Sequence, residues 1–137
     1  MTVLPPQVRP GLTGRAELVV GTNDTAPRVG SGRIAVLATP VMIGVIEAAA
    51  LEAVEHLLAD GTQSLGTRLD VSHVAATPVG MRLTATAELV AVDGRQLTFR
   101  VRAEDEHDLV SEGSHSRVVV DVERFDKRVR QKAQKRG

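Results

Sequence analysis

Residues 39–58 read TPVMIGVIEAAALEAVEHLL, and this stretch decides the fold. Its first residue, Thr39, has a hydroxyl that can cap a helix, and Pro40 follows where a missing N–H is tolerated. Apolar residues then cover nearly the whole circumference of a helix with about 3.6 residues per turn, which is typical of a helix surrounded by other structure. The sequence therefore predicts a buried helix that begins at Thr39 and ends near Asp60 and Gly61, because glycine commonly ends a helix.

Two residues interrupt this apolar stretch. Glu47 stands in its middle, and burying an unpaired carboxylate costs roughly several kcal/mol, so Glu47 must be neutral, paired or beside a wet cleft. A salt bridge to Arg68, Arg100 or Arg117 is the structural alternative to the cleft position. Gly44 costs the helix about 1 kcal/mol relative to alanine, and the close approach of a substrate or of a partner backbone would explain it.

Alternating apolar and polar residues predict strands on both sides of the helix. The predicted strands cover residues 14–20, 63–76, 81–92, 96–103 and 109–122. Residues 21–32 are rich in turn-forming residues and predict a long loop, and Asp93-Gly94 predicts a tight hairpin. One long buried helix followed by antiparallel strands predicts an α+β hotdog fold, in which a curved antiparallel sheet wraps the helix and a short C-terminal helix follows.

The same alternation predicts which side chains face the helix. The predicted inward residues are Leu65, Thr67, Leu69, Val71 and His73 in the second strand, Leu97, Phe99, Val101 and Ala103 in the fourth, and Val118, Val120 and Val122 in the last. Such a sheet leaves an edge strand and one side of the helix uncovered. Because a second copy would cover both, we expect a homodimer.

The length of 137 residues fits a single domain over residues 1–137. Residues 1–13, with three prolines, predict an extended lead-in that lacks the apolar core of a signal peptide. The long apolar run at 34–51 contains Pro40 and Glu47 and is not a clean membrane span. Cysteine is absent, which excludes disulfides and a thiolate nucleophile and fits a cytoplasmic protein.

Charge is balanced overall but not along the chain. The 17 basic and 17 acidic residues give a net charge of zero, and only two residues are aromatic, so we expect neither a nucleic acid nor a membrane as partner. Residues 123–137 hold seven Lys and Arg against two acidic residues, which leaves ten basic and fifteen acidic residues, or net −5, in residues 1–122. This basic C-terminal helix or tail could meet a polyanion such as the phosphates of a cofactor, although a solvated terminal helix is the commoner role.

Four segments resemble the fluoroacetyl-CoA thioesterase-like family of hotdog proteins. They are LATPVMIGVIE (37–47), SLGTRLDVSHVAATP (64–78), GSHSRVVV (113–120) and ERFDKRVRQK (123–132), so the resemblance spans about residues 36–132. It implies hydrolysis of a small acyl-CoA thioester to the free acid and coenzyme A. The residues at the family's motif positions are Thr39, Glu47 and His73 as the catalytic set, Gly66 as the backbone oxyanion donor and Arg117 as a substrate-site arginine.

Pattern alone gives two of these residues plainer roles. Thr39 caps a helix, although a hydroxyl at a helix N-terminus also lies where negative charge is stabilised. His73 is by pattern a core histidine, and only its motif context implies a catalytic or orienting role. His56, His107 and His115 have no such context. No two histidines have metal-site spacing, so we expect no metal and no cofactor beyond the coenzyme A of the substrate.

The sequence leaves the mechanism and the acyl group open. Either Thr39 or Glu47 attacks the thioester to give an acyl-enzyme, or Glu47 and His73 activate water directly. Arg33 stands where a bulky ring would be needed to close over a small halogenated acyl group, so a generic short or medium acyl-CoA is the expected substrate. A hotdog enoyl-CoA hydratase or dehydratase and a non-catalytic acyl-CoA binding module are the alternatives, and only hydrolysis would release free CoA thiol.

Overall fold

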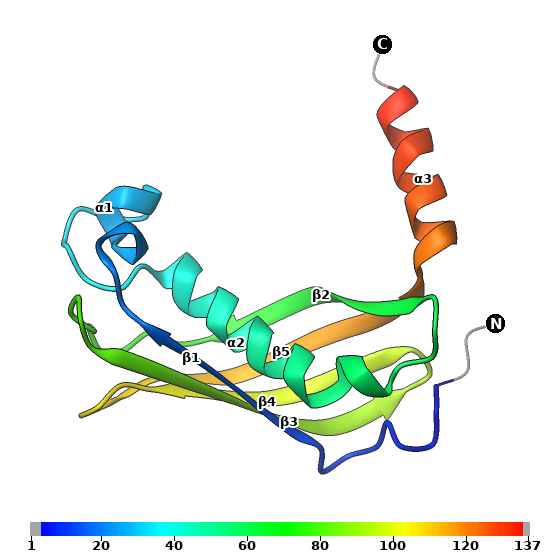
Figure 1. Cartoon of the computed structure of the whole chain (residues 1–137), viewed down its shortest axis with the longest axis horizontal. Helices are drawn as coiled ribbons and strands as arrows, with labels where there is room; N and C mark the ends of the chain where they lie inside the picture. The colour runs from blue at the N-terminus through cyan, green and yellow to red at the C-terminus, as the bar shows by residue number, and fades with distance from the viewer. Residues whose placement is uncertain (1–3, 136–137) are drawn as a thin grey trace.

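The computed structural model describes residues 4–135, which form a curled five-stranded antiparallel sheet around one long helix (Figure 1). The strands are β1 (Thr13–Val19), β2 (Thr62–Val71), β3 (Arg82–Asp93), β4 (Gln96–Glu104) and β5 (Leu109–Asp121). The helices are η1 (Thr22–Asp24), α1 (Ala26–Val29), α2 (Thr39–Val54), η2 (Glu55–Leu57) and α3 (Val122–Gln134). The predicted order of strand, buried helix, four strands and short C-terminal helix is therefore observed.

The sheet has the order β1-β3-β4-β5-β2, and every neighbouring pair is antiparallel. β1 and β2 are consequently the two edges. α2 lies mainly on β1 and β3, which leaves the concave face of β5 and β2 to one side of the helix. Part of the candidate site described below, the contact of Glu47 with Gly66 and Arg117, lies at this seam between α2 and the β5–β2 pair.

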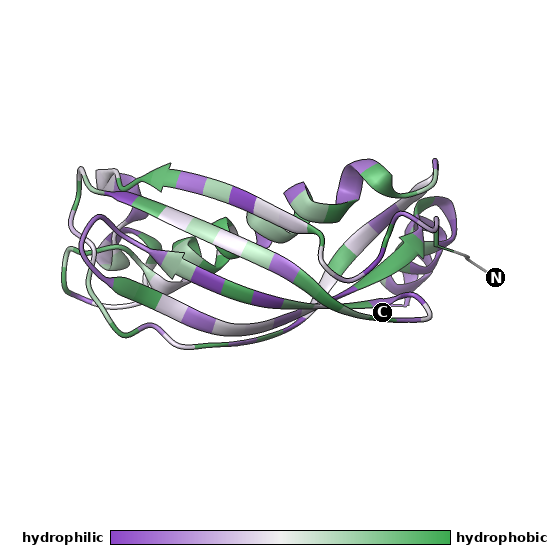
Figure 2. Cartoon of the chain, turned by 90° about the horizontal axis from the view of Figure 1, so that it is seen from below, coloured by the Kyte–Doolittle hydropathy of each residue, from purple (hydrophilic) through white to green (hydrophobic). Residues whose placement is uncertain are grey.

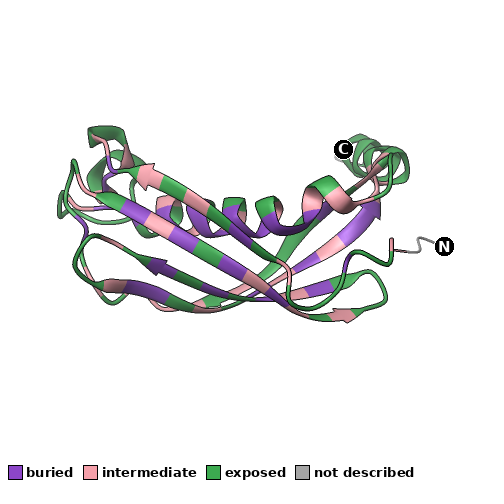
Figure 3. Ribbon diagram, turned by 60° about the horizontal axis from the view of Figure 1, so that its bottom comes forward, coloured by how far each residue is buried: buried purple, intermediate pink, exposed green. Residues whose placement is uncertain are grey.

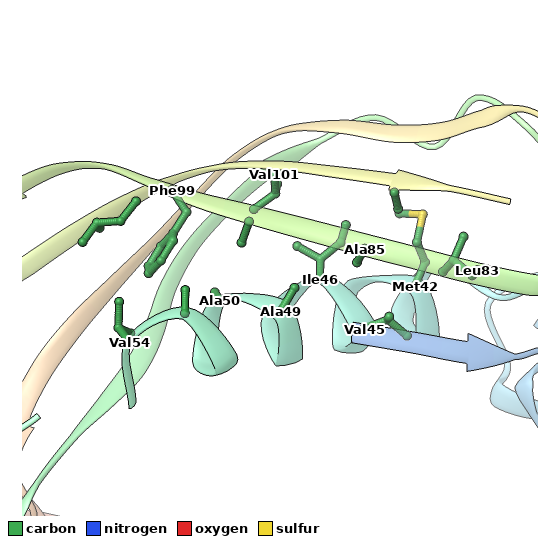
Figure 4. Close-up of a cluster of buried hydrophobic side chains, with 14 of the residues drawn as sticks. Met42, Val45, Ile46, Ala49, Ala50, Val54, Leu83, Ala85, Phe99 and Val101 are labelled. Atoms are coloured by element: carbon green, nitrogen blue, oxygen red, sulfur yellow. The ribbon is translucent and has the colours of Figure 1, made fainter. Parts of the chain in front are cut away.

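Hydrophobic and hydrophilic residues alternate along the strands (Figure 2), and buried and more exposed positions alternate along β3 and β4, as a half-buried sheet requires. The inward residues of β4 are the predicted ones: Leu97, Phe99, Val101 and Ala103 are all buried. They pack against buried residues of α2 such as Met42, Ile46, Ala49 and Ala50, and together these side chains form the core (Figure 4).

Two strands depart from the predicted faces. In β2 a bulge at Thr67, between the paired residues Gly66 and Arg68, shifts the alternation by one residue. Ser64 is therefore buried and Leu65 is exposed, whereas Leu69, beyond the bulge, still packs against the core. The prediction that Leu65 and Thr67 face inward was wrong because one extra residue reverses the pattern.

The last strand is also offset. Its inward residues are His115, Arg117 and Val119, while Val118 is half-buried. Val120 is buried as predicted, but Val122 is half-buried and begins α3 instead of ending the strand. Alternation does not distinguish the two faces here because residues 118–120 are all valine.

The other four strands begin and end within one residue of their predicted bounds, but three predicted segments differ more. The predicted loop at 21–32 contains η1 and α1, and the predicted strand at 63–76 ends at Val71. α2 gives way to the 3-10 turn η2 before the predicted end. In the lead-in, Val8 is buried in the core, and the Gly11 N–H donates to the carbonyl of Leu89.

α2 is covered on one side only. Buried and exposed residues alternate along its length (Figure 3), and its uncovered stripe includes the exposed Gly44 and Ala48 and the half-buried Val41 and Leu51. The apolar residues predicted on nearly all sides of the helix are thus present, and one side of the helix is left uncovered, as was also predicted. An apolar stripe of this kind is what a further protein surface covers.

Candidate active site

The first element of the site is a hydrogen bond between Thr39 and His73. The Thr39 hydroxyl oxygen lies 2.7 Å from His73 Nδ1. The N-cap of α2 is Ala38 and no side chain caps the helix, so the prediction of Thr39 as the cap was wrong by one position. Thr39 instead begins the helix, and its hydroxyl is free to face the ring of His73, which follows the end of β2.

His73 favours the neutral imidazole. Burial lowers its pKa below the ordinary value of 6.5, because desolvation disfavours the charged ring, and a backbone hydrogen bond at Ala75 opposes this only in part. A neutral ring whose Nδ1 accepts the Thr39 hydroxyl hydrogen is suited to withdraw that proton. The ring also lines a surface depression of about 290 Å³ whose other walls are Val36, Val74, Ala75 and Ala76.

The second element is the ion pair between Glu47 and Arg117. Arg117 Nη1 lies 3.4 Å from Glu47 Oε2, and the arginine side chain is 6% exposed while that of the glutamate is 38% exposed. Glu47 is therefore both paired and open to the seam beside α2. Of the two explanations that the sequence posed as alternatives, the salt bridge is observed, and the carboxylate is at the same time partly exposed.

The position of Arg117 is fixed by hydrogen bonds on the other side of its guanidinium. Nε donates to the Ser64 hydroxyl at 2.8 Å and Nη2 to the Ser64 carbonyl at 3.0 Å. The Ser64 hydroxyl in turn donates to Glu55 Oε1 at 2.6 Å. Two carboxylates thus compensate the buried Arg117 cation. Glu47 of α2 contacts it directly, and Glu55 of η2 acts through the Ser64 hydroxyl.

His115 completes this cluster. It is fully buried, its Nδ1–H donates to the Arg68 carbonyl at 2.8 Å, and its ring stacks on Phe99 with centroids 6.1 Å apart. Nε2 accepts from Arg117 Nη1 at 3.2 Å, which requires this nitrogen to be unprotonated. Burial and the nearby Arg117 cation lower the pKa of His115, although the Arg68 carbonyl and Glu47 oppose this shift.

Gly66 lies against the carboxylate of Glu47. A Cβ placed on Gly66 would be 2.6 Å from Glu47 Oε2 and 3.2 Å from His115 Cε1, distances that no side chain tolerates unless its neighbours move. Only glycine leaves this surface of β2 open to the seam. We refer to Glu47, Gly66, His115 and Arg117 together as the Glu47 cluster.

The predicted site residues thus fall into two groups. Three of them, Glu47, Gly66 and Arg117, are brought together, and Thr39 and His73 form a separate pair. Eight residues separate Thr39 from Glu47 within α2, which is about 12 Å along a helix axis. Within one chain the two groups therefore lie about two helical turns apart along α2.

Sequence reasoning missed three members of the network. His115 had been set aside, and neither Ser64 nor Glu55 had been named. A signal for His115 was present, since it stands two residues before Arg117 on one strand and residues so spaced share a face of the sheet. Among residues 4–135, no group of three or more His, Cys, Asp or Glu could hold a metal ion. In the same part of the chain, no helix is long and apolar enough to cross a membrane.

Comparison with known proteins shows the family to which the chain belongs. The sequence profile of the fluoroacetyl-CoA-specific thioesterase family matches residues 20–123. A fluoroacetyl-CoA thioesterase from Streptantibioticus cattleyicolor is 46% identical over 97 residues, which cover 71% of this chain and 70% of that protein. A structure of the fluoroacetyl-CoA thioesterase FlK superposes with a TM-score of 0.86 at 38% identity, covering 91% of this chain and 97% of that one. A hot-dog-like protein from Thermanaerovibrio acidaminovorans superposes with a TM-score of 0.82 at 26% identity, covering 90% and 91% of the two chains.

The wrapped helix and these similarities define a hotdog-fold acyl-CoA thioesterase. The family match covers most of the chain, and the chain belongs to the fluoroacetyl-CoA-specific thioesterase family. The predicted fold, family and class of activity are confirmed. The roles of Thr39, Glu47, His73, Gly66 and Arg117 stay predictions, and the geometry above is the basis for the proposals that follow.

Proposed function

We propose that the protein is a cytoplasmic homodimer that hydrolyses short or medium acyl-CoA thioesters with the Thr39–His73 pair and the Glu47 cluster. The observation that carries this proposal is the 2.7 Å hydrogen bond between the Thr39 hydroxyl and His73 Nδ1, which places a hydroxyl and a base in the geometry of an activated nucleophile. Coenzyme A enters only as part of the substrate, and no metal or further cofactor takes part.

The reaction needs a nucleophile and a place for the developing negative charge. An oxygen of Thr39, Glu47 or water attacks the acyl carbon, the carbon–sulfur bond breaks, and CoA leaves as the thiolate and takes up a proton. Water supplies the second oxygen of the acid in each route. The Gly66 backbone N–H and the N-terminal end of α2 stabilise the oxyanion, while neutral His73 withdraws and returns the proton.

A symmetric dimer brings the two groups of residues together. Thr39 and Glu47 lie on one helix about 12 Å apart, and residue 43 is midway between them. If a second α2 crosses in antiparallel direction near this midpoint, Thr39 of one protomer comes beside the partner's Glu47. The adjacent Gly44 is exposed, with no atom within 4 Å of a Cβ placed there, so it leaves room for such a close crossing.

The uncovered edge of the sheet favours the same assembly. β2 pairs only with β5, so its other side offers unpaired backbone groups. The large apolar side chain Leu65 is 37% exposed on β2. A two-fold copy that pairs β2 with β2 covers the edge and the stripe together.

The acyl group is set by the surroundings of His73. The depression beside it is lined by valine and alanine, and Ile34 in the preceding loop is 74% exposed. Of the two phenylalanines in the chain, Phe99 is in the core and Phe125 is on α3, so neither covers this depression. An open wall of small aliphatic side chains accepts a short or medium alkyl chain and does not enclose a fluoroacetyl group.

Thiol release from a panel of acyl-CoAs tests the proposed activity. We expect the purified protein to release CoA, and we expect Glu47→Gln and His73→Ala to lose about 100-fold or more in kcat while they stay folded. Release of CoA that survives both substitutions would place the site elsewhere. Addition of water to an enoyl-CoA without thiol release would favour the hydratase alternative, and tight binding without turnover the binding module.

Mixing two inactive variants tests the shared site. Thr39→Ala and Glu47→Gln damage different groups, so a mixed dimer contains one site with both substitutions and one intact site. We expect co-refolded mixtures to regain up to about a quarter of the parent activity, because half of the dimers are mixed and each has one working site. Absence of any recovery in mixtures shown to contain mixed dimers would place all the catalytic residues of a site on one chain.

A further inference from the structure

α3 carries two opposite surfaces. It begins where β5 ends and projects away from the sheet and from α2 (Figure 1). With about 100° per residue, Val122, Phe125 and Val129 share one side of the helix. Arg124, Lys127, Arg128 and Gln131 occupy the opposite side and line a shallow depression of about 400 Å³. We call these four residues the basic face.

The basic face is uncompensated within the described chain. All four of its residues are exposed, and among residues 4–135 the side-chain nitrogens of Arg124, Lys127 and Arg128 form no ion pair with a carboxylate, although the Asp121 carboxylate accepts from the backbone N–H of Arg124 at 3.0 Å. Residues 1–122 carry net −5, so the Lys and Arg residues of the C-terminal segment place positive charge, which attracts anions, on an otherwise acidic protein.

The basic face also lies at a suitable distance from the Glu47 cluster. Gly66 and Arg117 are paired across β2 and β5, and β5 runs four residues further, about 14 Å, before α3 begins at Val122. Arg124 and Lys127 are in the first two turns of that helix. An extended pantetheine arm spans this distance, so a thioester at Gly66 would bring the nucleotide end of its CoA to the start of α3.

We propose that the basic face of α3 binds the phosphates of the CoA nucleotide and so anchors the substrate of the proposed thioesterase. The inference rests on the proposed function, because it places the thioester at the Glu47 cluster. Arginine and lysine donate charge-assisted hydrogen bonds to phosphate oxygens, and Gln131 adds a neutral donor on the same side. The face selects acyl-CoA over thioesters that have no nucleotide.

Calorimetric titration with free CoA tests the proposal without requiring turnover. R124E/K127E reverses two charges on the basic face, and R130E/K132E reverses two charges on the same helix outside that face, so both variants change the net charge by the same amount. We expect R124E/K127E to weaken CoA binding about tenfold or more, and R130E/K132E to change it by less than about threefold. Hydrolysis of acetyl-pantetheine, which has no nucleotide, should be the same in all three proteins.

Three results would overturn the inference. Equal weakening in the two variants would mean that only the overall field of α3 matters. Unchanged binding in R124E/K127E, or no binding of CoA to the parent, would show that the phosphates lie elsewhere. Failure of the proposed function would instead abolish turnover of every thioester. Hydrolysis of acetyl-pantetheine by the parent protein therefore distinguishes that failure from these three results. Both variants leave the core untouched, and thermal unfolding checks that they are folded.

Discussion

The Cα of Gly66 lies so close to the Glu47 carboxylate that a Cβ on residue 66 would be 2.6 Å from Oε2. The contact joins the edge strand β2 to the middle of α2, and Arg117 lies next to both residues. Because the carboxylate is at the end of a flexible side chain, a methyl group at this position would displace it and leave the backbone in place. Position 66 therefore controls where Glu47 points.

Gly66→Ala should impair catalysis much more than folding. The new Cβ pushes Oε2 from its position, and a displacement of about 1 Å at a catalytic group can reduce the rate about 100-fold. We expect kcat to fall by that order, while the unfolding midpoint shifts by only a few degrees. Steady-state thiol release and thermal unfolding measure the two effects. An alanine variant with parental kcat would mean that the orientation of Glu47 is not needed for the reaction.

The decrease of kcat/KM at acidic pH, the acid limb of its profile, should reflect protonation of His73. Its pKa is lowered by burial, and the neutral ring is the form that withdraws a proton from Thr39. We expect kcat/KM to rise with pH through an apparent pKa below 6.5 and then to level off. Initial rates at fixed ionic strength from pH 4.5 to 8 give the profile, and the residual activity of His73→Gln should lack this limb. An acid limb centred above 6.5 would contradict the assignment.

His115 should make folding stability depend on pH. Its pKa in the folded protein is lowered from 6.5, so below that pH the unfolded chain binds more protons than the folded one. The contribution of neutral His115 to the free energy of unfolding is fully present above pH 6.5. It is lost as the pH falls through the lower pKa that His115 has in the folded protein. Protonation would also place a hydrogen of Nε2 against the guanidinium of Arg117.

The free energy of unfolding from urea titrations should therefore decrease from pH 7 toward pH 5. In His115→Gln the decrease should be smaller, since the contribution of His115 is removed, whatever the absolute stability of the variant. Parallel curves for the two proteins would show that His115 does not titrate over this range.

The part of the fold that sequence predicted well rests on long, regular patterns. The inward face of β4 was correct because its apolar residues alternate without a break, and the start of α2 was correct because Pro40 opens a long apolar stretch. The predicted inward faces of β2 and β5 were wrong in part, and the cause differs between the two strands. A bulge at Thr67 reverses β2 after its first half, and its position depends on pairing with β5, which a linear pattern does not contain.

The site shows a similar division. Family motifs pointed to Thr39 and His73, and the structure places their side chains 2.7 Å apart although 34 residues separate them. His115 was passed over because a buried histidine and a surface histidine look alike in sequence. Its burial follows from the stack on Phe99 and the bond to Arg68, which are contacts between strands that only the folded sheet creates.

Ala48→Glu tests the dimer on which the shared site depends. Ala48 is exposed on the uncovered stripe of α2, four residues after Gly44, so in an isolated protomer a glutamate there would meet only water. In a dimer closed over that stripe it would be buried beside its own symmetry copy, and two unpaired carboxylates cost roughly several kcal/mol each. We expect Ala48→Glu to sediment as a folded monomer and to lose thiol-releasing activity as a result, although Thr39, Glu47 and His73 are unchanged.

Thr86→Glu, which adds the same charge at an exposed position of β3, is the matched control and should remain dimeric and active. A monomeric Ala48→Glu that keeps parental kcat would show that one chain is sufficient for catalysis, and a dimeric one would show that the partner covers another surface.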